Sequence, residues 1–234
     1  MTAASGGGGG RAERAPGDAG AETGAEALPE GAERIGWAYA AADEPARAEA
    51  RFDAWADDYD RDVADLLGWR APEEALPFAL RHVPRDARIF DAGAGTGLVG
   101  RLLAPRGYPP IDGGDISRRM LEIAAASGAY AQILQIDLQA PLPIADATYD
   151  AVLCVGASGY MGPDALEEFA RVLRPGGVIL FTCGIETYDA RFAAWARARA
   201  AAGRLETLET GAPFQAIPRS EPDHLARAHV WRVS

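Results

Sequence analysis

Composition and charge restrict the possible functions of this 234-residue chain. The formal net charge is −11 at pH 7 and the pI is near 4.8, whereas nucleic-acid binding requires clustered cations that displace counterions. Two cysteines are too few for a disulfide framework, and no stretch approaches the roughly 20 apolar residues of a membrane span. We therefore expect a cytoplasmic protein with no nucleic-acid partner and no membrane segment; no oligomeric state is predicted.

Residues 1–33 consist mainly of Gly, Ala, Glu and Pro, with scarcely any large apolar side chain. Such a segment cannot bury enough surface to offset its ordering entropy. It lacks the apolar stretch of a secretory signal and is too acidic for organelle targeting. We predict a disordered tail over 1–33, an N-terminal helical lid over 34–85 and a main domain over 86–234.

Within the predicted lid, Phe52, Trp55, Tyr59 and Val63 recur at spacings of three and four, which predicts an amphipathic helix or a pair of helices. These side chains are most simply a buried stripe. Alternatively, the helix closes over a ligand with Tyr59 or Trp55 against it. The acidic run over 57–62 lacks the glycine and the distal Glu of a calcium loop. We therefore expect a solvated helix face there and no metal site.

From residue 88 onward, short apolar strands alternate with helical patterns, which is typical of βαβ units and a mainly parallel sheet. Strands are expected near 88–92, 111–115, 131–136, 149–155 and 177–183. Helices are expected near 97–106, 117–127, 164–173 and 187–202. The closing segment "HLARAHVWRVS" alternates apolar and polar residues and predicts a last strand. The fold class is therefore α/β.

A glycine loop follows the first of these strands. Gly93-x-Gly95-x-Gly97 overlaps a second motif, Gly95-x-Gly97-x-x-Gly100. A glycine turn between a parallel strand and a helix lets a ligand approach the backbone, and the helix N-terminus offers free N–H donors. The spacing alone does not choose between a dinucleotide, another nucleoside cofactor and a tight packing turn.

Acidic residues at the ends of three strands narrow this choice. Asp91 lies two positions before the first glycine, where a carboxylate can face an ammonium group but would repel a pyrophosphate. Asp115 ends the next strand, where acidic residues accept hydrogen bonds from ribose hydroxyls. Asp137 and Leu138 end the third strand and suit the edge and ring of an adenine. Together these residues predict a nucleoside joined to an amino acid.

The chain resembles the class I S-adenosylmethionine-dependent methyltransferases in four segments: "IFDAGAGTG", "GGDISRRML", "QIDLQAPLPIADATYDAVLCVGA" and "FARVLRPGGVILFT". More narrowly, "FDAWADDYDRDV", "WRAPEEA" and "GTGLVG" are similar to the methyltransferase-like proteins of the Williams–Beuren region. The resemblance implies a Rossmann-like, doubly wound, seven-stranded, mostly parallel sheet with an antiparallel last strand. It also implies that residues 86–234 form a class I methyltransferase domain.

The resemblance further implies S-adenosylmethionine as the cofactor. The glycine loop would surround its methionine end, Ile116 and Met120 would flank the adenine, and Val155 with Gly156 would border the methyl-transfer site. The full set of expected cofactor-binding residues is Tyr59, Asp91, Ala92, Gly93, Gly95, Gly97, Asp115, Ile116, Met120, Asp137, Leu138 and Val155. One departure is Gly114, where the family usually has a β-branched residue, so a weaker second strand is expected.

Methyl transfer from a sulfonium chiefly requires alignment of an acceptor nucleophile, so the core motifs identify neither the acceptor nor a catalytic base. The net negative charge of the chain favours a small-molecule acceptor over a nucleic acid. So does the segment "CVGASGYMG" after the fourth strand, which stands in place of the motif of amino-methylating nucleic-acid enzymes. Alternatives are a protein methyltransferase and a non-catalytic S-adenosylmethionine-binding protein; a dehydrogenase would need a further domain. His224 is a candidate general base, whereas His82 is explained by a helix end and Cys154 and Cys183 by burial in strands.

Overall fold

The computed structural model describes residues 33–234. The predicted tail over 1–32 lies outside the described residues, and Glu33 already belongs to the first helix. No helix in residues 33–234 has the length and apolarity needed to cross a lipid bilayer. The segment before the sheet contains α1 (Glu33–Tyr39), α2 (Pro45–Asp62), a π-helical turn η1 (Val63–Leu67) and α3 (Ala71–His82).

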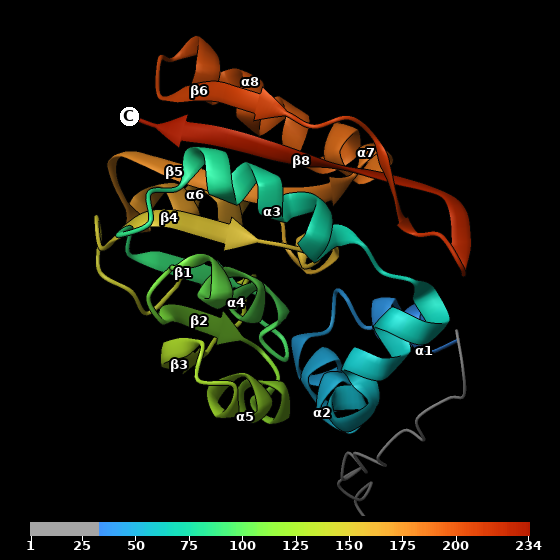
Figure 1. Ribbon diagram of the computed structural model, residues 1–234. Helices are drawn as coiled ribbons and strands as arrows, with labels where there is room; N and C mark the ends of the chain where they lie inside the picture. The colour runs from blue at the N-terminus through green and yellow to red at the C-terminus, as the bar shows by residue number, and fades with distance from the viewer. Residues whose placement is uncertain (1–32) are drawn as a thin grey trace, which may run out of the picture.

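An eight-stranded sheet in the order β3-β2-β1-β4-β5-β8-β6 forms the centre of the molecule, with β7 paired to β8 (Figure 1). Its strands are β1 (Ile89–Ala92), β2 (Ile111–Asp115), β3 (Tyr130–Gln135), β4 (Tyr149–Cys154), β5 (Leu173–Gly184), β6 (Leu205–Thr210), β7 (Phe214–Ile217) and β8 (Glu221–Val233). Strands β1 to β5 are parallel, and β8 is antiparallel to both β5 and β6. The predicted Rossmann-like α/β fold is confirmed. The short strand β7, which pairs only with β8 in a hairpin, was not predicted.

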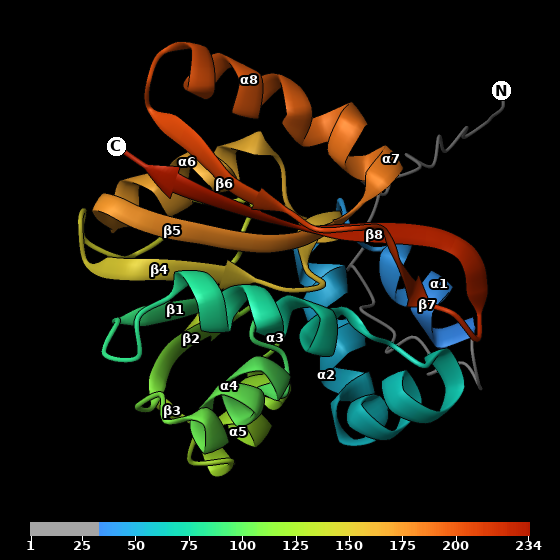
Figure 2. The same cartoon turned by 45° about the horizontal axis from the view of Figure 1, so that its top comes forward.

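Helices cover both faces of the sheet (Figures 1 and 2). One face carries α3, α4 (Leu98–Leu103) with η2 (Ala104–Arg106), and α5 (Arg118–Ala126). The other carries η3 (Ser158–Tyr160), α6 (Pro163–Val172), α7 (Ile185–Thr187), η4 (Tyr188–Phe192) and α8 (Ala193–Ala201). Successive residues of β5 serve the two cores, since Leu180 packs in the first and Phe181 in the second. A sheet buried on both faces explains the continuous apolar strands.

The N-terminal helices α1 and α2 lie beyond the carboxyl ends of β1 and β2, next to the β7–β8 hairpin (Figures 1 and 2). Here the predicted apolar stripe of α2 is confirmed as part of a third core, in which Trp55 and Val63 pack with Leu67 and with Ile217 of the hairpin. Helix α3 packs instead on the sheet, where Ala79 joins the core beneath it. The chain therefore brings α2 and η1 to the loop edge of the sheet and α3 to its face.

The solvated helix face expected for residues 57–62 is wrong at several positions. Asp62 is buried and accepts a hydrogen bond from Trp55 Nε1 at 2.9 Å, and it also pairs with Arg34. Asp60 accepts a hydrogen bond from Thr96 in the glycine loop. The acids bind arginines and hydroxyls of other elements, and these distant partners cannot be recognised from the run itself.

Gly114 has a packing role in β2. A Cβ there would lie 2.7 Å from Ile136 Cδ1 and 2.9 Å from Phe90 Cζ, closer than real Cβ atoms approach other side chains. The space that a β-branched residue would occupy is thus filled by its neighbours. The strand still pairs with β1 and β3 along its length.

Candidate active site

The glycine loop after β1 lies where the strand order reverses between β1 and β4, the usual ligand position in an open parallel sheet. Gly93 has φ +81°, and a Cβ there would lie 2.5 Å from Ala157 Cβ. Gly97 has φ +89° at the start of α4, and its Cβ would lie 2.8 Å from Tyr130 Cε2. Both positions therefore require glycine for conformation and for space.

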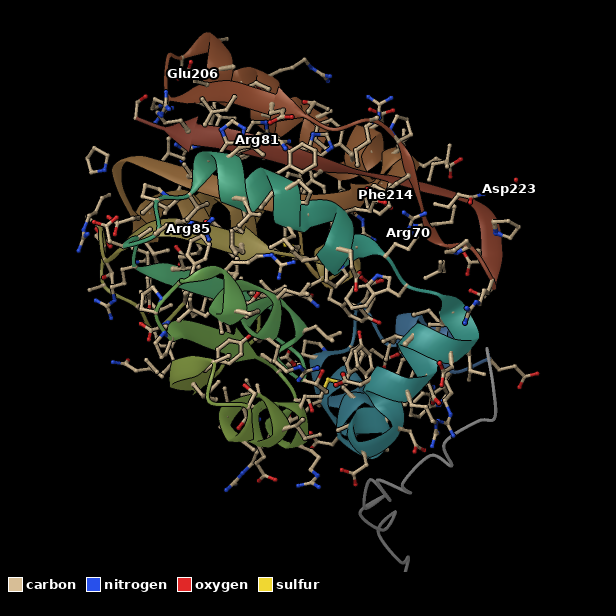
Figure 3. The ribbon with its side chains drawn as sticks, viewed as in Figure 1. Arg70, Arg81, Arg85, Glu206, Phe214 and Asp223 are labelled. Atoms are coloured by element: carbon tan, nitrogen blue, oxygen red, sulfur yellow. The ribbon has the colours of Figure 1, made fainter. Side chains whose placement is uncertain are left out.

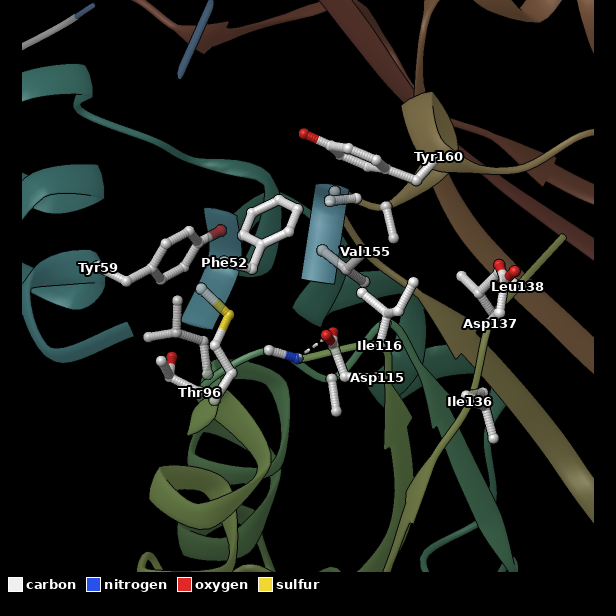
Figure 4. Close-up of a pocket in the computed structure, with 18 of the residues that line it drawn as sticks. Phe52, Tyr59, Thr96, Asp115, Ile116, Ile136, Asp137, Leu138, Val155 and Tyr160 are labelled. Carbon is white, nitrogen blue, oxygen red and sulfur yellow. Dashed lines mark hydrogen bonds between the residues drawn. The ribbon is translucent and has the colours of Figure 1, made fainter. Parts of the chain in front are cut away.

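A pocket lies over this loop and opens to solvent (Figure 4). It contains most of the residues predicted from the sequence: Tyr59, Gly93, Gly95, Asp115, Ile116, Met120, Asp137, Leu138 and Val155. The remaining predicted residues, Asp91, Ala92 and Gly97, are buried and do not line the pocket. Segments far apart in the sequence thus converge on one cavity.

Asp115 is held in a fixed orientation at the end of β2. Its Oδ2 accepts a hydrogen bond from the Gly95 backbone N–H at 2.9 Å, the dashed line at Asp115 in Figure 4. Its Oδ1 accepts one from the Ser117 N–H, also at 2.9 Å. Burial raises the pKa of Asp115, and these backbone hydrogen bonds oppose the rise. Because a carboxylate has about four acceptor positions, both oxygens can still accept hydrogen bonds from the hydroxyls of a ligand.

Asp91 is fully buried at the end of β1. Its Oδ2 accepts a hydrogen bond from the Tyr130 hydroxyl at 2.7 Å, whereas its Oδ1 has no hydrogen-bond partner within residues 33–234. Burial raises the pKa of Asp91 to about 7, and the nearby charge of Asp115 adds to this effect. An unpaired buried carboxylate oxygen is costly, so this site suits a cationic donor.

Tyr130, the partner of Asp91, was not predicted from the sequence. Its hydroxyl also accepts a hydrogen bond from the Gly100 N–H at 3.1 Å, and a Cβ at Gly100 would lie 2.6 Å from the tyrosine ring. Gly100 is therefore the position in α4 that admits the partner of Asp91. The only sequence signal was a third glycine in a motif that has two possible interpretations.

Apolar side chains beside the glycine loop form another part of the pocket wall. Ile116, Met120 and Leu138 line it, and Met120 and Leu138 are otherwise buried. Asp137 lies beside them and accepts a hydrogen bond from the Gln139 backbone N–H at 2.8 Å. Such a combination fits the ring and exocyclic edge of a base.

Acidic residues of α2 hold this helix against the pocket. Asp53 accepts hydrogen bonds from the Ser117 hydroxyl at 2.6 Å and from the Arg119 backbone N–H at 3.0 Å. Asp60 accepts one from Thr96 in the glycine loop. Helix α2 is therefore attached to the same two turns that carry Asp115 and the glycines.

Aromatic side chains separate the pocket from a second chamber, which lies between the N-terminal helices and the β7–β8 hairpin. Both cavities are bounded by Phe52, Tyr59, Trp69, Gly156 and Tyr160. In Figure 4, the aromatic rings of Phe52, Tyr59 and Tyr160 lie on one side of the pocket. The ring centroids of Phe52 and Tyr160 are 5.2 Å apart, in an edge-to-face arrangement. Gly156 has φ +81°, and a Cβ there would lie 2.2 Å from Trp69 Cζ2. The expected border after β4 is thus a close contact between backbone and indole, and Trp69 and Tyr160 are additions to the predicted set.

Comparisons with known proteins agree with this geometry. A methyltransferase-domain family model matches residues 89–177. Human methyltransferase-like protein 27 is 36% identical over 186 residues, which cover 77% of this chain and 73% of that protein. The chain belongs to the class I S-adenosylmethionine-dependent methyltransferases. S-adenosylmethionine is therefore the methyl donor of this methyltransferase.

More distant relatives cover less of the methyltransferase or share only its fold. A malonyl-[acyl-carrier protein] O-methyltransferase of Enterobacter lignolyticus is 37% identical over 100 residues, which span 42% of this chain and 39% of that protein. Magnesium protoporphyrin IX methyltransferase from Synechocystis, solved with bound S-adenosylmethionine, has a TM-score of 0.61 at 17% identity and covers 81% of this chain and 97% of its own. A TehB-like methyltransferase from Corynebacterium glutamicum has a TM-score of 0.56 at 19% identity; the match covers 77% of this chain and 99% of that chain.

Proposed function

We propose that this methyltransferase transfers a methyl group to a small-molecule acceptor where the two cavities meet. The pocket over the glycine loop and the second chamber share walls formed by Gly156, Trp69 and Tyr160, and this shared boundary carries the proposal. S-adenosylmethionine, when bound, supplies an electrophilic methyl group on its sulfonium. The protein then needs chiefly to align an acceptor atom with that methyl group and to exclude water.

The roles of the pocket residues follow from their geometry. We assign Asp115 to the ribose hydroxyls because both its oxygens are oriented by backbone N–H groups. We assign the unpaired Oδ1 of Asp91, which lies behind the pocket lining, to the ammonium end through water. Ile116 and Leu138 would hold the adenine ring, and Asp137 would lie at its edge. Their fit to the donor rests on this orphaned oxygen and on the fixed Asp115 carboxylate.

The lid that we propose is narrower than residues 34–85. Side chains spaced between Ile35 and Ala71 line one or both cavities, whereas the rest of α3 packs mainly on the sheet. The segments "FDAWADDYDRDV" and "WRAPEEA", which carry the resemblance to the methyltransferase-like proteins of the Williams–Beuren region, supply this lid and the Trp69 wall. We propose membership of that narrower group on these segments.

A small acceptor is favoured over a protein because the second chamber is bounded by the lid on one side and the β7–β8 hairpin on the other. The relatives named above are described as acting on a malonyl group carried by a protein and on a porphyrin. We further propose a cytoplasmic location, since Cys154 and Cys183 are both free and buried.

Calorimetry with S-adenosylmethionine, its demethylated product and NAD tests the cofactor assignment. We expect the first two to bind the wild type, Asp115→Asn to weaken that binding at least tenfold, and NAD not to bind. Glu206→Gln, which removes only an exposed ion pair with Arg232, is the matched control. Incubation of a metabolite extract with isotopically labelled donor then identifies the acceptor by mass. Binding of NAD alone would overturn the proposal, and label on protein alone would favour a protein acceptor.

A further inference from the structure

We propose, building on the function proposed above, that the second chamber takes an uncharged, mainly aromatic or aliphatic acceptor with a hydroxyl group, and that His224 accepts the hydroxyl proton. The chamber is walled by aromatic and aliphatic side chains from the lid, β5 and the β7–β8 hairpin. Its polar side chains, besides the shared tyrosines, are Ser158, Thr182, Cys183 and His224.

The charge of the walls restricts the acceptor. No arginine, aspartate or glutamate is among the described residues that line the chamber. Apart from the His224 imidazole, the described walls would offer a carboxylate acceptor no cation, and they would offer a protonated amine no acid. A hydroxyl group carries no charge before reaction, so its burial among these aromatic residues does not leave an unpaired ion.

Two of the polar groups are already committed. Thr182 Oγ1 accepts a hydrogen bond from the Gly156 backbone N–H at 2.9 Å, which fixes the turn after β4. Burial raises the pKa of the Cys183 thiol to about 11, against the opposing hydrogen bond with Ser158, so Cys183 stays a neutral thiol. Among the polar residues that line the chamber, this leaves the His224 imidazole, whose ring nitrogen can accept a proton.

His224 lies beside the end of β5. A Cβ at Gly184 would lie 3.2 Å from His224 Cε1 and 3.3 Å from its Nε2, so the absent side chain of Gly184 leaves room for the imidazole. The other ring nitrogen, Nδ1, faces Glu221 Oε2 at 3.7 Å. This carboxylate would stabilise the imidazolium formed when Nε2 takes a proton, as in other base and carboxylate pairs.

The hairpin that carries His224 is fixed to the lid. Arg219 Nη1 donates hydrogen bonds to the carbonyl oxygens of Ala64 and Asp65 at 3.0 and 2.6 Å, and the Arg70 backbone N–H donates to Ala216 O at 3.0 Å. Figure 3 shows the hairpin, marked by Phe214 and Asp223, projecting toward the segment that carries Arg70. These hydrogen bonds therefore fix the position of the hairpin wall of the chamber relative to the lid wall.

The reaction balances with these groups. The oxygen–carbon bond forms as the sulfur–carbon bond breaks, the sulfonium leaves as a neutral thioether, and the hydroxyl proton passes to Nε2 of His224. Methylation of a carboxylate would need no such base, because that acceptor is already ionised. The imidazole and the absence of cations among the lining residues therefore point to the same acceptor class.

A matched set of bicyclic probes tests the acceptor class: 2-naphthol, 2-naphthoate and 2-naphthylmethylamine, each with labelled S-adenosylmethionine. We expect label on naphthol at least tenfold above the other two, and naphthol binding that quenches the fluorescence of Trp55 and Trp69 in the chamber wall. Preferential labelling of the carboxylate or the amine would overturn the proposal. The proposal would also be overturned if the donor binds but naphthol neither binds nor reacts. If the donor itself does not bind, the result counts against the proposed function.

His224→Gln tests the role of the imidazole. We expect kcat for naphthol to fall about 100-fold with KM changed less than twofold, in the range of general-base effects. A nitro-substituted naphthol that is already ionised at the assay pH should lose less than threefold. His82→Gln, at the end of α3 and outside both cavities, should leave both reactions unchanged. Equal losses for both acceptors, or no loss for naphthol, would overturn the role of His224.

Discussion

The buried pair of Asp91 and Tyr130 predicts a pH-dependent affinity for the methyl donor. Asp91 has one oxygen bound by the Tyr130 hydroxyl and one without a partner, and burial raises its pKa to about 7. If the ammonium group of the donor binds the ionised carboxylate, the free protein must lose a proton before or during binding. Affinity should therefore rise as the pH rises toward 7.

The magnitude follows from the ionised fraction of Asp91. With a pKa of about 7, this fraction is about 3% at pH 5.5 and about 50% at pH 7. Because the apparent Kd varies inversely with the competent fraction, affinity should increase about 15-fold, or about 1.6 kcal/mol, over this range. The donor's own α-amino group stays mainly protonated below its pKa of about 7.8, so it contributes little to the change.

Calorimetry at pH 6.5 in two buffers of different ionisation heat measures the proton directly. We expect release of about 0.7 to 0.8 protons per donor bound, the fraction of Asp91 that is protonated in the free protein at that pH. Asp91→Asn should bind more weakly at pH 7, and its affinity should not change between pH 5.5 and 7. A wild type that releases no proton, or a variant with the same pH dependence as the wild type, would refute the role of Asp91.

Three further substitutions test other parts of the structure. Burial lowers the pKa of His229 to about 4, so its contribution to folding stability is complete above about pH 6.5 and falls as the pH drops toward 4. Between pH 7 and 5, the free energy of unfolding of the wild type should fall by about 2 kcal/mol more than that of His229→Phe in urea unfolding. Equal losses in the two proteins would contradict this. Gly156→Ala should displace Trp69 and lower kcat/KM at least tenfold in steady-state assays, so unchanged kinetics would show that the contact is not needed. Asp60→Asn should loosen the lid because it weakens the hydrogen bonds of residue 60 with Thr96 and Arg101. The donor Kd should rise about threefold in calorimetry, and proteolysis within α2 should become faster. An unchanged rate of proteolysis would argue against this.

The positions of the pocket residues could be predicted because parallel strands end at one edge of the sheet. Asp115 and Asp137 follow successive strands, so their convergence with the glycine loop requires only the correct strand order. The helical stripe of α2 was equally visible, since its spacing of three and four residues is a local property. What these patterns could not give was the state of Asp91, because its burial depends on Tyr130, which lies 39 residues later in the chain.

The second chamber shows why an acceptor is harder to predict than a cofactor. Its walls come from η1, the turn after β4, the end of β5 and the β7–β8 hairpin. This hairpin lies beside β5 because β8 pairs antiparallel with both β5 and β7. No single segment has a motif for this arrangement: Thr182 looks like any strand residue, and Gly184 gains a role only when His224 lies against it. A cofactor common to a family imposes residues on local turns, whereas an acceptor is selected by the charge and shape of a cavity between distant segments. The absence of arginine, aspartate and glutamate among the described residues that line this cavity is therefore more informative about the acceptor than any stretch of the sequence.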